Sequence, residues 1–110
     1  METKIGKIQQ IHVGYGSYQD AQLGVSVTLG SDKDAWGVVD FKGFWGMKPS
    51  PNAKWSAEDQ RGHLGDTFLW LGQLLNDAKK TKVEALTGVP VECTFENMTL
   101  KSWRVLTEVI

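Results

Sequence analysis

The sequence contains little that would support an extracellular or membrane protein. Cys93 is the only cysteine among 110 residues, so the chain cannot form an internal disulfide. No apolar run approaches the roughly 20 residues that a membrane-spanning helix needs. Residues 1–7 lack the apolar segment of a signal peptide. We therefore expect a protein of the reducing cytoplasm that does not bind membranes.

A strong net charge is also missing. Twelve Lys and Arg residues stand against 13 Asp and Glu residues, which gives a net charge of −1. This balance argues against the basic surface of a general nucleic-acid binder and against a disordered acidic tail. The only break in the chain that is marked by prolines is residues 47–52, and no repeat or low-complexity tract is present. A chain of this length is expected to form a single domain over residues 1–110.

The sequence before these prolines is typical of β-strands. Apolar and polar or small residues alternate over residues 22–29, the period of two that a half-buried strand shows. Residues 4–13 are rich in β-branched residues, but their isoleucines fall three apart, which predicts either two partly covered faces or a β-bulge. Residues 35–45 predict a third strand. The short, turn-rich linkers between these segments favour an antiparallel meander.

The sequence after the prolines predicts one long helix. Ser56 followed by two acidic residues is typical of a helix start, and apolar residues recur every three or four positions to about Lys80. We interpret most of this stripe as core; it consists of Leu64, Phe68, Leu71, Leu75 and Ala78. Three further residues widen the apolar surface, and we expect them to form the interface of a homo-oligomer: Leu69, Trp70 and Leu74.

The C-terminal part predicts a β-hairpin. A short helical turn over residues 81–87 precedes residues 89–95, where apolar and polar side chains alternate. Residues 100–109 return as a partner strand across a turn at Asn97 and Met98. The element order is β-β-β-α-β-β. We therefore predict an α+β fold in which one long helix packs on one face of an antiparallel sheet.

A glycine-rich, aromatic loop is the first candidate binding segment. In residues 14–20, two glycines free the backbone beside two phenols, an amide and a carboxylate. The candidate ligand or partner contacts there are Tyr15, Tyr18, Gln19 and Asp20. A purely structural loop that covers the sheet edge is the equal alternative. The segment is not a dinucleotide fingerprint, because Gln19 stands where the third glycine is required.

The second candidate segment is residues 36–46, where large rings alternate with glycines. Trp36, Asp40 and Trp45 are the candidate contacts, since the glycines leave space for another flat group. The alternative is that the rings fill the core of a small domain. Asp40 shares a predicted strand face with Trp36 and Lys42, so its carboxylate needs solvent, a cation or a donor-bearing ligand. Lys42 is the simplest partner.

The sequence holds no recognisable catalytic or metal-binding pattern. Cys93 has the parity of core residues, and no local spacing pairs it with His12 or His63. Spaced cysteines and paired helical histidines are absent. We expect no catalytic residue, no metal and no cofactor. A small enzyme that uses Asp20 or Asp40 with His12 remains an alternative.

Three stretches, GYGSYQDA (14–21), WGVVDF (36–41) and LKSWRVL (100–106), together resemble a family of small proteins carried by prophages and other mobile elements. The resemblance implies a bacterial or phage accessory protein in the cytoplasm and supplies no catalytic residues.

We expect a non-enzymatic binding module that engages a host protein or a small ligand through the aromatic, glycine-rich loop. Five tryptophans are more than so short a chain can bury, so some should line an interface or a pocket. Single-stranded nucleic-acid or nucleotide binding is the alternative, although it is not favoured. It requires scattered basic residues to gather beside Trp45 or Trp55, and it predicts an affinity that falls steeply with salt.

Overall fold

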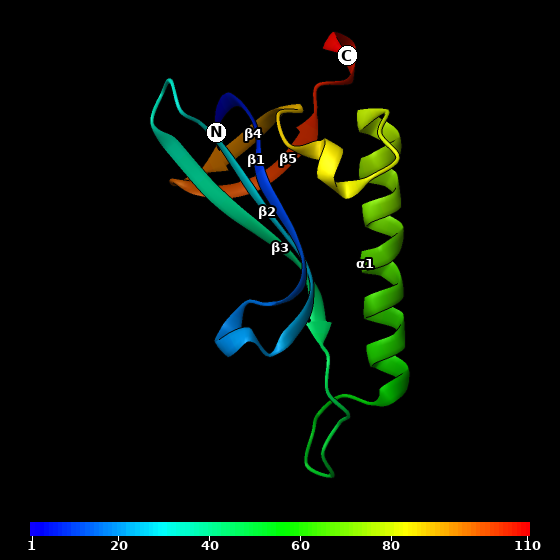
Figure 1. The fold of residues 1–110 in the computed structure, drawn as a ribbon. Helices are drawn as coiled ribbons and strands as arrows, with labels where there is room; N and C mark the ends of the chain where they lie inside the picture. Colours follow the sequence, from blue (N-terminus) through cyan, green and yellow to red (C-terminus); the bar gives the residue numbers. More distant parts are fainter.

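The computed structural model describes the backbone of residues 1–110 and every side chain except that of Tyr18. Within this described part, five strands and one long helix follow the order β-β-β-α-β-β (Figure 1). The predicted α+β class and element order are thereby confirmed. The elements are β1 (Glu2–Gly16), β2 (Gln22–Ser31), β3 (Trp36–Trp45), α1 (Ala57–Ala78), β4 (Pro90–Glu96) and β5 (Thr99–Val105).

The strands form an antiparallel sheet with the order β3-β2-β1-β4-β5. β1 belongs to both halves of this sheet, because residues 7–16 pair with β2 and residues 2–7 pair with β4. The register shifts between Ile8 and Gln10, which confirms the bulge that the isoleucine spacing predicts as one alternative. A bulge bends its strand and increases the twist. Accordingly, β4 and β5 run across the direction of β2 and β3 (Figure 1).

Close contact between β2 and β3 depends on two glycines. Gly24 and Gly43 are opposite each other in the β2–β3 pair. A Cβ atom on Gly24 would overlap the carbonyl oxygen of Lys42, and a Cβ atom on Gly43 would overlap that of Leu23. Side chains are therefore excluded from both positions by the backbone of the neighbouring strand.

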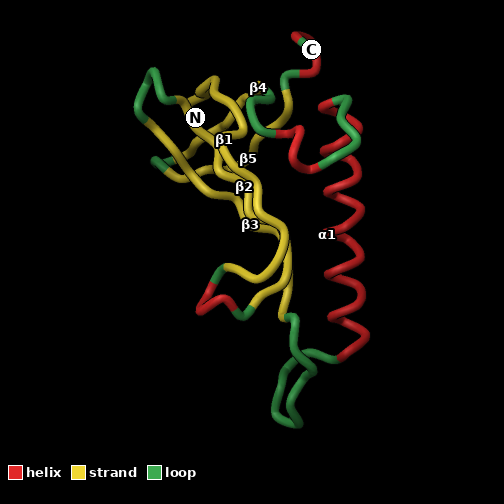
Figure 2. The backbone as a smooth tube through the Cα atoms, viewed as in Figure 1, coloured by secondary structure: helices red, strands yellow, loops and turns green.

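The core lies between the sheet and the C-terminal half of α1. Val25, Val27 and Leu29 of β2 are at most 2% exposed, as their alternation predicts. The buried residues of α1 are Leu71, Leu74 and Ala78, all in its C-terminal half. Figure 2 shows the helix alongside the sheet, with a loop that reaches beyond the sheet leading into its N-terminus.

Two predictions about α1 are corrected by this packing. Leu74 is only 5% exposed, so it is a core residue and offers no surface to a second subunit. Phe68 is 68% exposed, so it does not belong to the core. Both differences have one cause: the buried face of α1 is made by Leu71, Leu74 and Ala78, so it includes Leu74 and leaves Phe68 outside the core.

The ends of three elements also differ from the prediction. β1 continues to Gly16, through the first residues of the predicted loop. The helix ends at Ala78, where Lys79 takes a left-handed conformation with φ of 58°. β5 ends at Val105 instead of continuing to residue 109, because residues 107–109 form a 3-10 turn. The short helical turn expected over residues 81–87 is present as a 3-10 segment at Val83–Leu86.

Candidate binding site between two sheet edges

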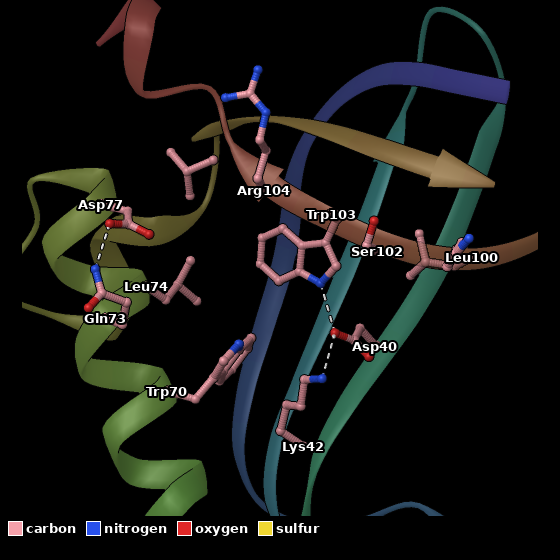
Figure 3. A pocket seen from close by; sticks show the side chains of 12 residues that line it. Asp40, Lys42, Trp70, Gln73, Leu74, Asp77, Leu100, Ser102, Trp103 and Arg104 are labelled. Atoms are coloured by element: carbon pink, nitrogen blue, oxygen red, sulfur yellow. Dashed lines mark hydrogen bonds and ion pairs between the residues drawn. The ribbon is translucent and has the colours of Figure 1, made fainter. Parts of the chain in front are cut away.

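The outer strands β3 and β5 approach each other on the core side of the curled sheet. Trp103 of β5 donates its Nε1–H to Asp40 Oδ2 of β3 at 2.7 Å (Figure 3). Asp40 is opposite the buried Val27, and Trp103 is opposite the buried Cys93. Opposite residues of an antiparallel pair share one face, so both side chains point to the core side. A side-chain hydrogen bond therefore links the two ends of the sheet.

Four side chains from three elements meet at this link, and we call them the edge site: Asp40, Lys42, Trp70 and Trp103. Lys42 Nζ lies 4.0 Å from Asp40 Oδ2 and 5.8 Å from the ring centroid of Trp70. The ring of Trp70, on α1, meets that of Trp103 edge to face, with centroids 6.1 Å apart. The Asp40 side chain is 22% exposed. The edge site thus combines a shielded carboxylate, an ammonium group and two indoles.

The edge site opens into a cavity of about 300 Å³. Gln73 and Asp77 of α1 lie on its rim, and the Gln73 amide donates to Asp77 at 2.8 Å (Figure 3). Residues 100–105 of β5 form the opposite wall. The cavity is therefore bounded by the helix on one side and by the two edge strands on the other.

The basic residues of β5 at this cavity are already paired. Arg104 donates two hydrogen bonds to Glu108, at 3.0 and 2.9 Å, and one to Glu92 at 3.2 Å. These bonds raise the pKa of Arg104 and, from the other side, lower the pKa of Glu108 to about 2. Lys101 pairs with Glu96 at 3.1 Å. Lys42, at 4.0 Å from Asp40, is held more loosely than either.

Cys93 lies behind the edge site and is not accessible to a ligand. Its side chain is fully buried, and burial raises the pKa of the thiol to about 11, with smaller contributions from the charges of Asp40 and Glu92. A thiol with this pKa is protonated at neutral pH and is a poor nucleophile. The core position that its parity predicts is confirmed.

The structure places the predicted residues of β3 far from one another. Trp36, at one end of β3, packs edge to face on Phe95 with centroids 5.7 Å apart, and Lys4 lies over its ring. Trp45 is at the other end, about 30 Å away at 3.3 Å per strand residue. Asp40 lies between them. The predicted grouping of these three residues in one site is therefore not realised, and only Asp40 belongs to the edge site.

The predicted loop lies at the far end of the β1–β2 hairpin. Tyr15 is 53% exposed and contacts the backbone at Gly46, where an added Cβ atom would be 2.6 Å from its ring. Gln19 and Asp20 are exposed and have positive φ angles of 52° and 53°. Tyr18 was predicted to contact a ligand, but its side chain lies outside the described residues. Ligand binding by this loop stays a prediction.

Sequence reasoning identified half of the edge site. The sequence predicts that Asp40 needs a donor, with Lys42 as its simplest partner, and it places Trp70 at a subunit interface. The role of Trp103 was missed, because its partner is 63 positions away and the strand order was unknown. None of the five indoles is fully buried. This exposure agrees with the expectation that the chain has more tryptophan than its core can hold.

No protein-family model, curated protein sequence or solved structure matches this chain. Among the described residues, no three His, Cys, Asp or Glu side chains are grouped so that they could hold a metal ion. In the same part of the chain, α1 is not apolar enough over its length to cross a membrane, and no other helix is long enough.

Proposed function

We propose that this chain is a non-enzymatic binding module whose edge site receives a basic side chain of a partner protein. The observation that carries this proposal is the position of Lys42. Its ammonium group is near both the Asp40 carboxylate and the face of Trp70. A carboxylate beside an indole face is an arrangement that attracts ammonium and guanidinium groups. The protein's own lysine thus marks where a partner's cation would bind.

Lys42 can be displaced by a better ligand. Its side chain is 46% exposed, and 4.0 Å is too long for a hydrogen bond to Asp40. Exposed ion pairs of this kind contribute about 0–1 kcal/mol. A guanidinium group forms shorter, bidentate bonds to a carboxylate and also stacks on aromatic rings. Asp40 is suited to bind a guanidinium group because the indole N–H of Trp103 donates to one of its carboxylate oxygens and so fixes the orientation of the side chain.

The size of the cavity supports a single side chain as the ligand. About 300 Å³ is at the lower end of the range for small-molecule pockets, roughly 300–1,000 Å³. An arginine or lysine side chain fits such a space with its aliphatic stem against the indoles. The mobile-element origin and the cytoplasmic setting belong to this proposal as predictions from the sequence.

The proposal is tested by titrating the ¹⁵N-labelled protein with the peptide acetyl-Gly-Arg-Gly-amide. We expect the indole N–H signal of Trp103 to shift, and no shift with the citrulline peptide, which has the same shape but no charge. Asp40→Asn keeps an acceptor for Trp103 and should abolish binding. Lys42→Gln should strengthen binding by up to about 5-fold, because it removes a competitor whose pair contributes at most about 1 kcal/mol.

Lys101→Gln is the matched control. Lys101 lines the same cavity but is paired with Glu96, so its replacement should leave the affinity for the arginine peptide almost unchanged. Weaker binding of the arginine peptide by Lys42→Gln would contradict the proposal, because Lys42 would then assist the peptide instead of competing with it. Unchanged binding in Asp40→Asn would remove the edge site from the interaction.

A second candidate function is single-stranded nucleic-acid binding, and the topology favours it. A curled five-stranded sheet resembles the partly open barrel of OB-folds, whose second and third strands bind oligonucleotides. Phe41 and Trp45 are opposite Ser26 and Gln22, so both side chains are on the face of β3 away from the core. They could stack on bases there.

Titration with oligothymidine distinguishes this candidate from the first. Binding at the outer face of β3 should quench tryptophan fluorescence, weaken steeply as salt is added, and be lost in Trp45→Ala. Asp40→Asn should leave it intact. Absence of quenching at low salt would exclude this function.

A further inference from the structure

An apolar groove lies between the N-terminal half of α1 and the core side of β1 and β2. It encloses about 520 Å³. Val13 of β1 is opposite Val25 of β2, so both side chains are on the core side of the sheet. Because α1 buries residues only in its C-terminal half, this part of the sheet is left partly uncovered. The apolar side chains that line the groove are Val13, Leu23, Val25, Leu64, Phe68 and Leu71.

The groove borders the hydrophobic core and opens to water. Val25 and Leu71, which line it, are only 2% and 6% exposed and belong to the core. Val13 and Phe68 also line it, but they are 52% and 68% exposed. A ligand between these two side chains would remove their apolar surface from water, which favours binding. The groove is therefore suited to the apolar part of a ligand.

The groove is narrow and carries a charge at one end. Among the residues that line it, Arg61 is the charged one, and it lies near the start of α1. The helix wall from Gln60 to Leu71 is about 16 Å long at ~1.5 Å per residue. Over this length, the volume of about 520 Å³ corresponds to a mean cross-section of roughly 30 Å². Arg61 is at the N-terminal end of this wall, and the contact with the core at Leu71 is at the other end.

The guanidinium group of Arg61 has no partner among the described residues. It takes part in none of the ion pairs and none of the side-chain hydrogen bonds in that part of the chain. Asp59, the nearest acidic residue in the sequence, accepts from the backbone N–H of Ser56 at 2.9 Å instead. Arg104, the other arginine, donates to both Glu92 and Glu108. Arg61 is thus the arginine that is available to a ligand.

We propose that the groove binds an unbranched aliphatic carboxylate, with the tail along the groove and the head group on Arg61. A guanidinium group forms bidentate, charge-assisted hydrogen bonds to a carboxylate. Small-molecule sites of roughly 300–1,000 Å³ typically combine an apolar lining with a few polar groups that fix the orientation of the ligand. A flat polar ligand would leave its polar groups without partners between these walls. One chain with one terminal anion matches a narrow groove with one terminal cation.

This groove is separate from the edge site. The two cavities share no lining residue. Leu69 is 75% exposed and lines neither of them, so a subunit contact through Leu69 stays a prediction from the sequence.

The test is calorimetric titration with decanoate, whose extended length is close to that of the helix wall, below the concentration at which it forms micelles. From hexanoate to decanoate, the affinity should rise about 2–4-fold with each methylene group, because each one removes further apolar surface from water. Decanol has the same tail without the charge and should bind about 10-fold more weakly. In the ¹⁵N-labelled protein, decanoate should shift the Nε–H signal of Arg61 and leave that of Arg104 in place.

Two variants separate the head group from the tail. Arg61→Gln should weaken decanoate binding about 10-fold and leave decanol binding unchanged. Phe68→Ser should weaken the binding of both ligands by a similar factor, at least about 3-fold, because it removes part of the apolar wall. Circular dichroism should show that both variants fold, since both residues are exposed. Lys33→Gln is the matched control: it makes the same charge change in the exposed β2–β3 turn and should leave decanoate binding unchanged, as should Asp40→Asn.

Several results would overturn the inference. One is the absence of decanoate binding at millimolar concentration, and another is equal affinity of the wild type and Arg61→Gln for decanoate. Decanol that binds as tightly as decanoate would rule out a carboxylate as the recognised group. Sedimentation of the wild type as a dimer that Phe68→Ser dissociates would show that a second copy occupies the groove. Arg61-dependent co-sedimentation with phosphatidylglycerol vesicles would assign the groove to a lipid surface instead of a free ligand.

Discussion

Replacing Trp103 by phenylalanine should weaken the link between the two edges of the sheet. The variant keeps most of the ring against Trp70 but removes the indole N–H that Asp40 Oδ2 accepts at 2.7 Å. The Asp40 carboxylate is only 22% exposed, so water cannot fully replace this donor. Lys42 at 4.0 Å is then the nearest remaining partner of that carboxylate.

The expected loss of stability is about 2–4 kcal/mol. A hydrogen bond to a charged group contributes about 1.5–3 kcal/mol, and the smaller ring loses up to about 1 kcal/mol of apolar burial. Unfolding of 110 residues has an entropy near 0.23 kcal/mol per kelvin, on the basis of about 2.1 cal/mol/K per residue. The melting temperature should therefore fall by roughly 9–17 °C.

Urea unfolding followed by circular dichroism measures the free-energy change, and a double-mutant cycle isolates the hydrogen bond. In an Asp40→Leu background, Trp103→Phe should cost only the ring difference, so the coupling energy between the two positions should be about 1.5–3 kcal/mol. Trp45→Phe is the matched control, because its indole donates none of the hydrogen bonds described in the structure. A coupling energy below about 0.5 kcal/mol would refute the reasoning, as would equal losses in the two tryptophan variants.

Three further outcomes follow from single residues. Cys93, fully buried and with its pKa raised to about 11, should resist thiol reagents at pH 8 until the chain is unfolded in urea. Gly43→Ala should yield no folded protein by circular dichroism, whereas Gly62→Ala, in open space on α1, should raise stability by up to about 1 kcal/mol. Arg104 lowers the pKa of Glu108 from 4.5 to about 2. The wild type should therefore be more stable than Glu108→Gln above pH 4.5, and this difference in unfolding free energy should vanish as the pH falls towards 2. A stability difference between the wild type and Glu108→Gln that grows as the pH falls would contradict this role of Arg104.

Local patterns were sufficient to predict the elements of the fold. The alternation in β2 reflects one buried face, and the isoleucine spacing in β1 reflects the bulge between Ile8 and Gln10. Ser56 begins α1 through a capping box with Asp59, whose pKa is lowered by its hydrogen bond with the Ser56 backbone N–H. Each of these features depends on neighbours within a few positions, which is the range over which periodicity carries information.

The edge site and the orientation of α1 could not be predicted in the same way. Whether Trp103 meets Asp40 depends on how far the sheet curls, and this follows from pairings between distant segments. The apolar surface of α1 is wide, so periodicity alone does not decide whether Phe68 or Leu74 faces the sheet. That choice depends on where β3 and β5 lie. The need of Asp40 for a donor was predictable from chemistry, but the identity of the donor was not.

The glycine pair between β2 and β3 also constrains how this sequence can diverge over evolutionary time. At Gly24 and Gly43 any side chain would occupy the space of the opposing backbone, so a single substitution at either position would disrupt the strand pairing. Tryptophans and charges elsewhere can be exchanged for residues of similar shape. Descendants that keep this strand pairing should therefore share these two glycines when little else is recognisable, and the spacing of 19 positions between them is a signature with which distant relatives can be sought.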